Sequence, residues 1–276
     1  MHHDSQLLDF TEEEVSTAVS SCRRTDLLDG DGLSLNAFIC AFVNHSAAIT
    51  LFLNSIAGDF AQFADLTVFG KPWGKTSAKS DVADVRLILP QGTIMTVFDI
   101  LISQRLLVFL ENHFGQIPVG AYLGGGKKTQ PMEIASALQL AIDKGLDNES
   151  DGCIAQSDIQ RFFDTLPVLL ITLWLVNVGV CPRLVALCVR HQFFSTIMIV
   201  CEGSMAFPRI CFRGLGGLTG SRVAGVLARI PVLDMLHKHS RSWLKLGFQN
   251  SISIAAWIDN FYVAADTPHK ATRILT

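Results

Sequence analysis

The segment Ala155–Asp164, which reads Ala-Gln-Ser-Asp-Ile-Gln-Arg-Phe-Phe-Asp, is one of two short segments that decide the fold of this chain. The other, Ala256–Val263, reads Ala-Trp-Ile-Asp-Asn-Phe-Tyr-Val. Each has one aspartate, Asp158 or Asp259, at the edge of an apolar stretch typical of a β-strand. An aspartate there is costly unless it is paired or bound to a metal ion. Two such carboxylates, brought together by folding, would form a site for two Mg²⁺ ions and hence for nucleotidyl transfer.

Each aspartate also has a purely structural explanation. Residues 251–265 are apolar on both sides of Asp259 and Asn260, which predicts a hairpin with these two residues as its turn. For the hairpin alone, a plain turn is the favoured interpretation. Asp158 would similarly cap the turn that follows its strand. Both explanations would have to hold, in the right order and at the right distance, for the metal site to be a coincidence.

The composition indicates a folded protein with a sizeable core. The chain has 276 residues, of which 49% are apolar and 17% are charged, enough for one large domain or two small ones. Its seven cysteines include no Cys-x-x-Cys pair, so we expect reduced, mostly buried thiols in an intracellular protein and no structural zinc site. We expect no secretory signal, because no basic segment followed by an apolar stretch opens the sequence.

The charge is uneven along the chain. Residues 1–150 contain 10 Lys and Arg against 18 Asp and Glu, a net charge of −8, whereas residues 151–276 contain 12 against 7, a net charge of +5. The half with the two aspartates is therefore basic, as a surface facing a phosphate backbone would be. Unevenly distributed solvated charge is the alternative explanation.

One apolar run approaches the length needed to cross a bilayer. Thr165–Pro182 contains no charged residue, but it includes two prolines and an asparagine, and an apolar helix buried in a large core has the same pattern. We therefore expect no membrane partner. An unrelated helical or membrane-associated protein is the alternative that this run favours.

The periodicity and the turn residues predict a mixture of helices and short strands. Thr11 is a suitable N-cap, with Glu14 as its capping-box partner, and Asp147–Gly152 is the best candidate domain boundary. We expect helices over 33–66, 94–113, from Pro131 onward, within 165–201 and over 221–238 with an interruption at Pro231, strands at 85–89 and 153–158, and a polar loop at 71–80.

Two Gly-rich stretches fail to match nucleotide-binding fingerprints. Gly124–Thr129 lacks the Ser or Thr that follows Gly-Lys in a Walker loop, and Gly214–Gly220 has Thr219 where the dinucleotide pattern requires its last glycine. These fingerprints are excluded.

Taken in order, the segments resemble the reverse transcriptase of non-LTR, LINE-type retrotransposons. Ser157–Asp164 resembles motif A of that family, Asp-x-x-x-x-Phe-Asp, and Trp257–Asn260 resembles motif C, aromatic-x-Asp-Asp. Between them, Arg213–Ser221 resembles motif B, in which a Gln-Gly pair precedes a serine. Upstream, Val85–Ile88 and Ser103–Leu106 resemble the fingers strand and the Arg-Leu helix.

The resemblance implies an α+β fold, the fingers and palm of a right-hand polymerase, with a small antiparallel palm sheet backed by helices. Residues 1–150 would form the fingers-like region and residues 151–276 the palm-like region, with no thumb after motif C. The implied activity is RNA-directed DNA polymerisation on an RNA template and a DNA primer, with dNTPs as substrates and Mg²⁺ or Mn²⁺ as cofactor. A non-catalytic nucleic-acid-binding remnant of the same fold is the alternative.

The resemblance also implies roles for individual residues. Asp158 and Asp259 would be catalytic and would bind the metal ions, together with the backbone carbonyl of Ile159 and with Asn260. The nucleotide would contact four residues: Arg86 at the triphosphate, Phe163 under the sugar, where it would exclude a 2′-hydroxyl, and Gly217 and Ser221 in the pocket.

Two residues depart from the family pattern inside these motifs. Asn260 replaces the second aspartate of motif C, so one negative charge is lost from the metal site. Gly216 replaces the usual glutamine of motif B, which removes a contact to the template or the nucleotide. Both changes favour lower activity, and both are consistent with the remnant alternative.

Overall fold

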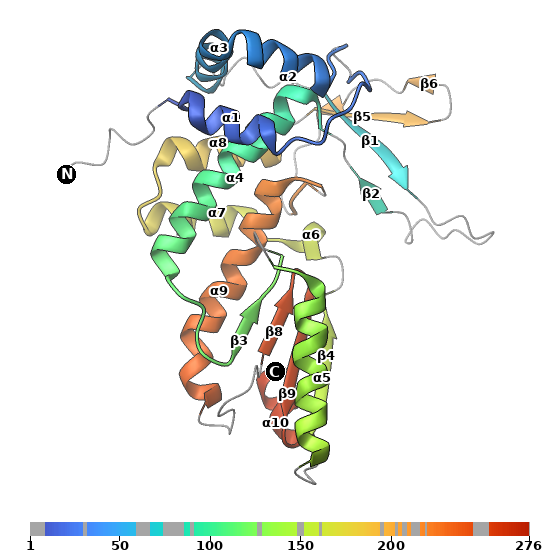
Figure 1. Ribbon diagram of the computed structural model, residues 1–276, viewed down its shortest axis with the longest axis vertical. Helices are drawn as coiled ribbons and strands as arrows, with labels where there is room; N and C mark the ends of the chain where they lie inside the picture. Colours follow the sequence, from blue (N-terminus) through green and yellow to red (C-terminus); the bar gives the residue numbers. More distant parts are fainter. Residues whose placement is uncertain are drawn as a thin grey trace. The chain divides into compact units, whose positions relative to one another are not determined.

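The computed structural model describes residues 9–29, 32–58, 67–73, 86–88, 91–125, 129–147, 152–159, 162–193, 196–201, 204–205, 209–210, 216–218, 220–244 and 254–275. These residues form a mixed α+β fold, as expected from the sequence (Figure 1). The chain divides into two compact units, Met1–Val108 with Phe163–Val226, and Phe109–Phe162 with Leu227–Thr276. Each unit combines two separate stretches of sequence, so these compact units differ from the sequence ranges 1–150 and 151–276. The functional division into fingers-like and palm-like regions stays a prediction.

The first unit is mainly helical. Its opening helix is capped as the sequence predicts, because the backbone N–H of Thr11 donates to Glu14 Oε2 (2.8 Å) and the backbone N–H of Glu14 donates to Thr11 Oγ1 (3.2 Å). The helices with residues in this unit are α1 (Glu12–Ser20), α2 (Leu35–Asn44), α3 (Ser46–Gly58), α4 (Thr93–Phe114), α6 (Phe162–Thr165), α7 (Val168–Asn177), α8 (Pro182–Phe193) and α9 (Arg222–Leu244).

A sheet of short strands completes the first unit. It contains β1 (Thr67–Trp73), β2 (Arg86–Ile88), β5 (Thr196–Cys201), β6 (Ser204–Met205) and β7 (Arg209–Ile210). The strand order is β2-β1-β5-β6, β7 also pairs with β5, and only β1 and β5 run parallel. Two predictions are wrong here. The polar loop expected from residue 71 begins with the end of β1, and the helical region expected up to residue 201 ends in β5.

The second unit contains the smaller sheet, with strand order β3-β8-β9-β4 (Figure 1). Its strands are β3 (Ala121–Leu123), β4 (Cys153–Asp158), β8 (Ile254–Trp257) and β9 (Asn260–Ala265). The strand predicted at 153–158 is therefore confirmed. Three strands are antiparallel, as expected for a small antiparallel sheet, whereas β3 pairs parallel to β8.

Helices pack against this sheet, as expected. Val232, Leu233 and Leu236 of α9 are buried in one cluster with Ile254 and Val263 of the sheet. This unit also contains α5 (Pro131–Asp147), which begins at the predicted proline, and α10 (Pro268–Leu275). The interruption predicted at Pro231 is wrong, since α9 continues through that residue.

Within the described residues, one helix is long and apolar enough to span a membrane, and a bent pair of helices would pass the same test together. The long helix is α4, and 61% of its most apolar window is buried inside the protein. The bent pair is α2 with α3. In the run noted in the sequence, α7 has only 10 residues. The absence of a membrane partner stays a prediction.

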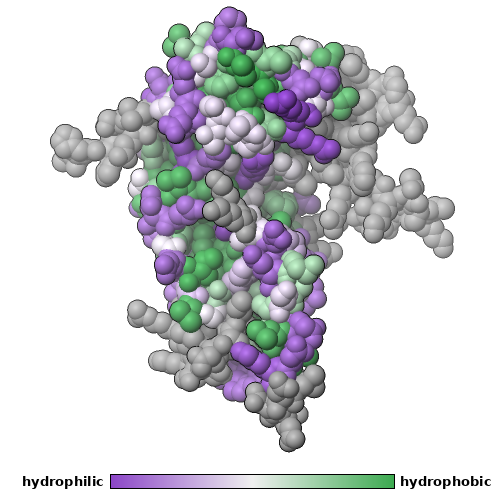
Figure 2. Space-filling view, in the orientation of Figure 1, coloured by the Kyte–Doolittle hydropathy of each residue, from purple (hydrophilic) through white to green (hydrophobic). Residues whose placement is uncertain are grey.

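Polar and apolar side chains are interspersed on the face drawn in Figure 2. None of the five cysteines whose side chains the structure describes forms a disulfide, in agreement with reduced thiols. The expectation that they are mostly buried is wrong, because only Cys188 is buried, Cys40 is exposed, and the other three are half-buried.

Candidate functional site

The two aspartate segments meet in the second unit. Strand β4 pairs with β9 in an antiparallel ladder that places Asp158 directly opposite Asn260. One step further, the backbone N–H of Ile159 donates a 2.9 Å hydrogen bond to the backbone carbonyl of Asp259. Residues directly opposite each other in such a ladder lie about 4.5–5.5 Å apart at their Cα atoms. The fold thus brings Asp158, Asp259 and Asn260 to one end of one strand pair.

The hairpin turn lies one residue earlier than predicted. Trp257 pairs with Asn260, so the two loop residues are Ile258 and Asp259, and Asn260 is the first residue of β9. Ile258 has a φ of +56°, in the left-handed region. A β-branched residue in this region is strained, and such strain is concentrated at functional sites.

The side chains of Asp259 and Asn260, which are adjacent in the sequence, are joined by a hydrogen bond. The side-chain amide of Asn260 donates from Nδ2 to Asp259 Oδ1, at 3.0 Å. Asp158 is exposed, and Asp259 and Asn260 are half-exposed, so all three side chains are accessible to solvent. Because Asn260 and Asp158 are opposite partners, their side chains lie on the same face of the sheet. Their joint coordination of a metal ion stays a prediction.

The donor atoms at this strand end suit Mg²⁺. Two carboxylates, one amide oxygen and the backbone carbonyl of Ile159 are all oxygen ligands, which this ion prefers. Among the residues that the structure describes, no three His, Cys, Asp or Glu side chains cluster as a metal site. An aspartate at position 260 would supply the third carboxylate here.

A Gly-rich loop supports the hairpin from the neighbouring strand. The backbone N–H of Gly124 donates to the carbonyl of Ala256 (2.8 Å), and the ring of Trp257 covers Gly124 so closely that a Cβ there would lie 2.0 Å from Trp257 Cε3. Gly125 follows with a φ of +74°. The stretch that fails as a Walker loop therefore has a structural use, because only glycine fits beneath Trp257.

The remaining predicted site residues lie in the first unit. Gly217 is buried, and its backbone N–H donates to the carbonyl of Phe163 (2.7 Å). The adjacent Gly216 donates to the carbonyl of Leu166 (2.9 Å). Arg86 begins β2 opposite Trp73, and its side chain lies outside the described residues. The structure thus brings Phe163 and Gly217 together through their backbones, and their contacts to a nucleotide stay predictions.

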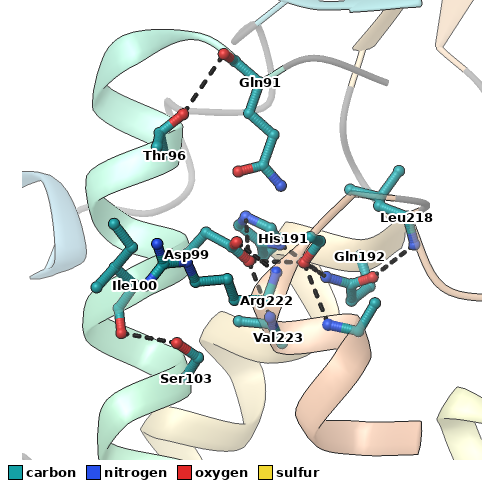
Figure 3. A network of polar contacts seen from close by, with 12 residues as sticks. Gln91, Thr96, Asp99, Ile100, Ser103, His191, Gln192, Leu218, Arg222 and Val223 are labelled. Atoms are coloured by element: carbon teal, nitrogen blue, oxygen red, sulfur yellow. Dashed lines mark hydrogen bonds and ion pairs between the residues drawn. The ribbon is translucent and has the colours of Figure 1, made fainter. Parts of the chain in front are cut away.

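Ser221 is hydrogen-bonded to Asp99 and Gln192, two members of the buried polar network that Figure 3 shows in close-up. Its hydroxyl donates to Asp99 Oδ1 (2.6 Å) and accepts from Gln192 Nε2 (2.9 Å) and from the backbone N–H of Ala224 (3.2 Å). Ser221 is only 6% exposed, so these protein groups occupy its hydroxyl. Its contact with a nucleotide stays a prediction.

The sequence analysis missed two members of this network, Asp99 and Gln192. They lie 122 and 29 residues from Ser221 along the chain, so no local pattern connects them to it. An aspartate inside the apolar helix α4 was the one available signal, because a buried carboxylate needs hydrogen-bond partners. Burial also lowers the pKa of the adjacent His191, and the negative charge of Asp99 opposes this effect.

Comparisons with known proteins are informative at the level of the fold. No protein-family model and no curated protein sequence matches this chain. Two solved telomerase structures are similar to it. Apo telomerase from Candida tropicalis, truncated from its C-terminal domain, matches with a TM-score of 0.53 and 11% identity over 87% of this chain. Telomerase from Candida albicans, in complex with a fragment of telomeric RNA, matches with a TM-score of 0.52 and 11% identity over 86%.

The chain spans 58% and 44% of the lengths of these two telomerase chains. At 11% identity, the likeness concerns the fold alone. Telomerase is a reverse-transcriptase-type enzyme. The mixed α+β architecture, with its small four-stranded sheet, is consistent with a polymerase-like fold.

Proposed function

We propose that this chain is the core of an RNA-directed DNA polymerase of the LINE-type retrotransposon kind. One observation carries the proposal, namely the register that sets Asp158 opposite Asn260 and joins Ile159 to Asp259 by a backbone hydrogen bond. It places the aspartates of two distant segments, each resembling a polymerase motif, at the same strand end. The reverse-transcriptase-like fold supports the same assignment.

The metal ligands of the proposed site are the carboxylates of Asp158 and Asp259, the carbonyl of Ile159 and the amide oxygen of Asn260. Bound Mg²⁺ or Mn²⁺ would supply charge stabilisation to the attacking and leaving oxygens of the transfer. The hydrogen bond from Asn260 Nδ2 holds Asp259 Oδ1 in the absence of metal. A carboxylate offers about four lone-pair sites, so Asp259 can bind an ion while this hydrogen bond persists.

The substrate contacts follow from the motif resemblance. Arg86 would bind the triphosphate, Phe163 would lie under the sugar and exclude a 2′-hydroxyl, and Gly217 and Ser221 would line the nucleotide pocket. The RNA template and the DNA primer would lie against the basic half of the sequence, residues 151–276.

A second candidate function is a non-catalytic nucleic-acid-binding protein on the same fold. The hydrogen bond between Asn260 and Asp259 favours it, because the amide satisfies one oxygen of Asp259 without a metal ion and brings no third carboxylate. The two candidates make the same prediction for nucleic-acid binding and opposite predictions for synthesis.

Primer extension on an RNA template tests the proposal. The wild-type chain, Asp158→Ala and Asn260→Asp are compared in Mg²⁺ and in Mn²⁺. We expect slow synthesis by the wild type, a loss of about 100-fold or more in Asp158→Ala, and faster synthesis by Asn260→Asp. The matched control is Asp266→Ala, which removes an exposed carboxylate just after β9, at the end of that strand opposite to Asp259.

The outcomes separate the two candidates. Synthesis that is indifferent to Asp158→Ala would overturn the metal site. Binding of a primer–template without any extension, even by Asn260→Asp, would establish the non-catalytic function instead. A loss in Asp266→Ala equal to that in Asp158→Ala would show that the effect is one of charge or stability.

A further inference from the structure

The loop before α9 is held by two buried side chains from other helices (Figure 3). Asp99 of α4 accepts three hydrogen bonds at the start of α9, from the Ser221 hydroxyl (2.6 Å) and from the backbone N–H groups of Arg222 (2.6 Å) and Val223 (3.0 Å). A carboxylate at this position satisfies free N–H groups and complements the positive end of the helix. The N-terminus of α9 is therefore fixed to α4.

Gln192 of α8 holds the same loop a few residues earlier. Its Oε1 accepts from the backbone N–H of Leu218 (2.8 Å), and its Nε2 donates to the Ser221 hydroxyl (2.9 Å) and lies 2.8 Å from His191 Nδ1. Gln192 is 1% exposed and Asp99 is 3% exposed. Because protein groups engage both ends of the buried amide, the position of Leu218 depends on Gln192.

The opposite side of the loop is bonded to the segment that begins at Phe163. The backbone N–H of Gly217 donates to the Phe163 carbonyl (2.7 Å), and the backbone N–H of Gly216 donates to the Leu166 carbonyl (2.9 Å). A continuous set of hydrogen bonds thus runs from Asp99 and Gln192 through the loop to the backbone of Phe163.

Close packing at the two glycines leaves little room for the loop to shift. A Cβ at Gly216, whose φ is +90°, would lie 2.8 Å from the Asp164 carbonyl oxygen and 2.9 Å from that of Phe163. A Cβ at Gly217 would lie 2.9 Å from the Ala224 Cβ. Since the two glycines pack closely against the backbone of Phe163 and Asp164 and against the Ala224 side chain, a displacement at Leu218 would move Phe163 as well.

We propose that Asp99 and Gln192 are positioning residues that set the backbone of Phe163 and, through it, the selection of deoxyribose over ribose. The inference rests on the proposed function, in which Phe163 excludes the 2′-hydroxyl. Asp99 and Gln192 act on this selection only through Ser221, Leu218 and Gly217. Each comes from a regular helix, which is the support that a precisely placed group needs.

The test compares incorporation of a dNTP and of the matching rNTP in primer extension, with Asn260→Asp as the background enzyme. Gln192→Met keeps the length of the side chain and removes its hydrogen bonds, and Asp99→Asn keeps the shape and turns one acceptor into a donor. In both variants we expect the ratio of dNTP to rNTP kcat/KM to fall by about tenfold or more, the scale at which a pocket discriminates one small group.

The matched control is Leu187→Ala, which removes buried packing from the same helix as Gln192 and touches none of these hydrogen bonds. Melting curves fix an assay temperature at which every variant is folded. A general loss of stability lowers the rates with both nucleotides and leaves their ratio unchanged. Unchanged ratios in Gln192→Met and Asp99→Asn would therefore overturn the proposal.

Amide hydrogen exchange tests the same hydrogen bonds without catalysis. In the wild type, the amides of Gly216, Gly217 and Leu218 should exchange at least about 100-fold more slowly than in an unfolded chain. In Gln192→Met the Leu218 amide should lose this protection, but not in Leu187→Ala. Unprotected amides in the wild type would overturn the positioning role even if no variant folded. If protection is present but the background enzyme makes no DNA, the proposed function fails and sugar selection fails with it.

Discussion

Asp158 and Asn260 are opposite partners at the last pair of the β4–β9 ladder, and the Asn260 amide is already bonded to Asp259. A neutral side chain that donates a hydrogen bond is thus the register partner of Asp158 and the bonded neighbour of Asp259. Its hydrogen bond stabilises the carboxylate of Asp259 in the metal-free protein, but a neutral amide adds no negative charge to attract a cation. The rate of synthesis at this site should therefore be limited by its affinity for metal ions more than by its backbone geometry.

Asn260→Asp should shift the metal dependence of synthesis. The change replaces a donor with a carboxylate, so half-maximal extension should need about tenfold less Mg²⁺, the effect of one additional charge near the ion in a partly solvated site. The measurement is a Mg²⁺ titration at saturating dNTP. Gln130→Glu, which adds the same charge at an exposed position before α5, should leave the titration unchanged. An equal shift in both variants would contradict the local explanation.

Gly124→Ala should destabilise the hairpin. A methyl group at this position would lie inside the ring of Trp257, with a Cβ–Cε3 distance of 2.0 Å, so the indole must move. We expect a loss of about 1–3 kcal/mol in the free energy of unfolding, as for other overpacked sites. Chemical denaturation measures it, and a blue or red shift of Trp fluorescence reports the displaced ring.

Gly225→Ala is the matched control for that change. Gly225 lies within α9, and a Cβ there meets no atom within 4 Å. Replacing a helical glycine in open space should stabilise the protein by about 0.5–1 kcal/mol. Equal losses in both variants would mean that the contact with Trp257 does not explain the effect at Gly124.

Acid should weaken the first unit through Glu14. A hydrogen bond from Arg105 (2.8 Å) is the main reason why the pKa of Glu14 is lowered. A carboxyl group with a lower pKa in the folded state stabilises the protein above its unfolded pKa, about 4.3. That contribution is lost as the pH falls through the lower, folded-state pKa.

The pH dependence of the urea midpoint measures this contribution. In Glu14→Gln the midpoint should be lower near neutral pH and should fall less on acidification than in the wild type. Glu13→Gln, one residue earlier on the exposed side of α1, should follow the wild-type curve. A Glu14→Gln curve parallel to the wild type would remove Glu14 from the acid response.

Thiol labelling should separate the cysteines by burial. Burial raises the pKa of the Cys188 thiol, so little thiolate forms there, and the reagent cannot reach it in the folded protein. Cys40 lies exposed on α2. With a maleimide near neutral pH, Cys40 should react first and Cys188 only on unfolding, as read by peptide mass spectrometry. Fast labelling of Cys188 in the folded protein would contradict its burial.

Local patterns predicted the elements whose causes are local. Thr11 and Glu14 lie three residues apart, and their capping box formed as predicted. The strand 153–158 was predicted to the residue because Asp158 and the polar turn before Cys153 mark its ends. The hairpin was also predicted, although its turn lies at Ile258 and Asp259, since an isoleucine is not expected at a positive φ.

The elements that were missed depend on distant partners. Strand β1 contains Gly70, Lys71 and Pro72, which are typical of loops, and it is held as a strand by pairing with β5, more than a hundred residues away. Strand β5 is a short apolar run, which periodicity alone cannot distinguish from a buried helix. The network around Asp99 and Gln192 likewise joins three helices, and no sequence window contains it.

The positive φ of Ile258 lowers the stability of the hairpin, but the same turn conformation fixes the direction of Asp259. Glycine or asparagine at this position would relieve the strain, so selection for thermostability alone would favour either one. The same change would allow the turn to sample conformations in which Asp259 points elsewhere. Stabilised versions of this protein should therefore be chosen with position 258 held constant, because a gain in stability at this position would loosen Asp259, on which the proposed chemistry depends.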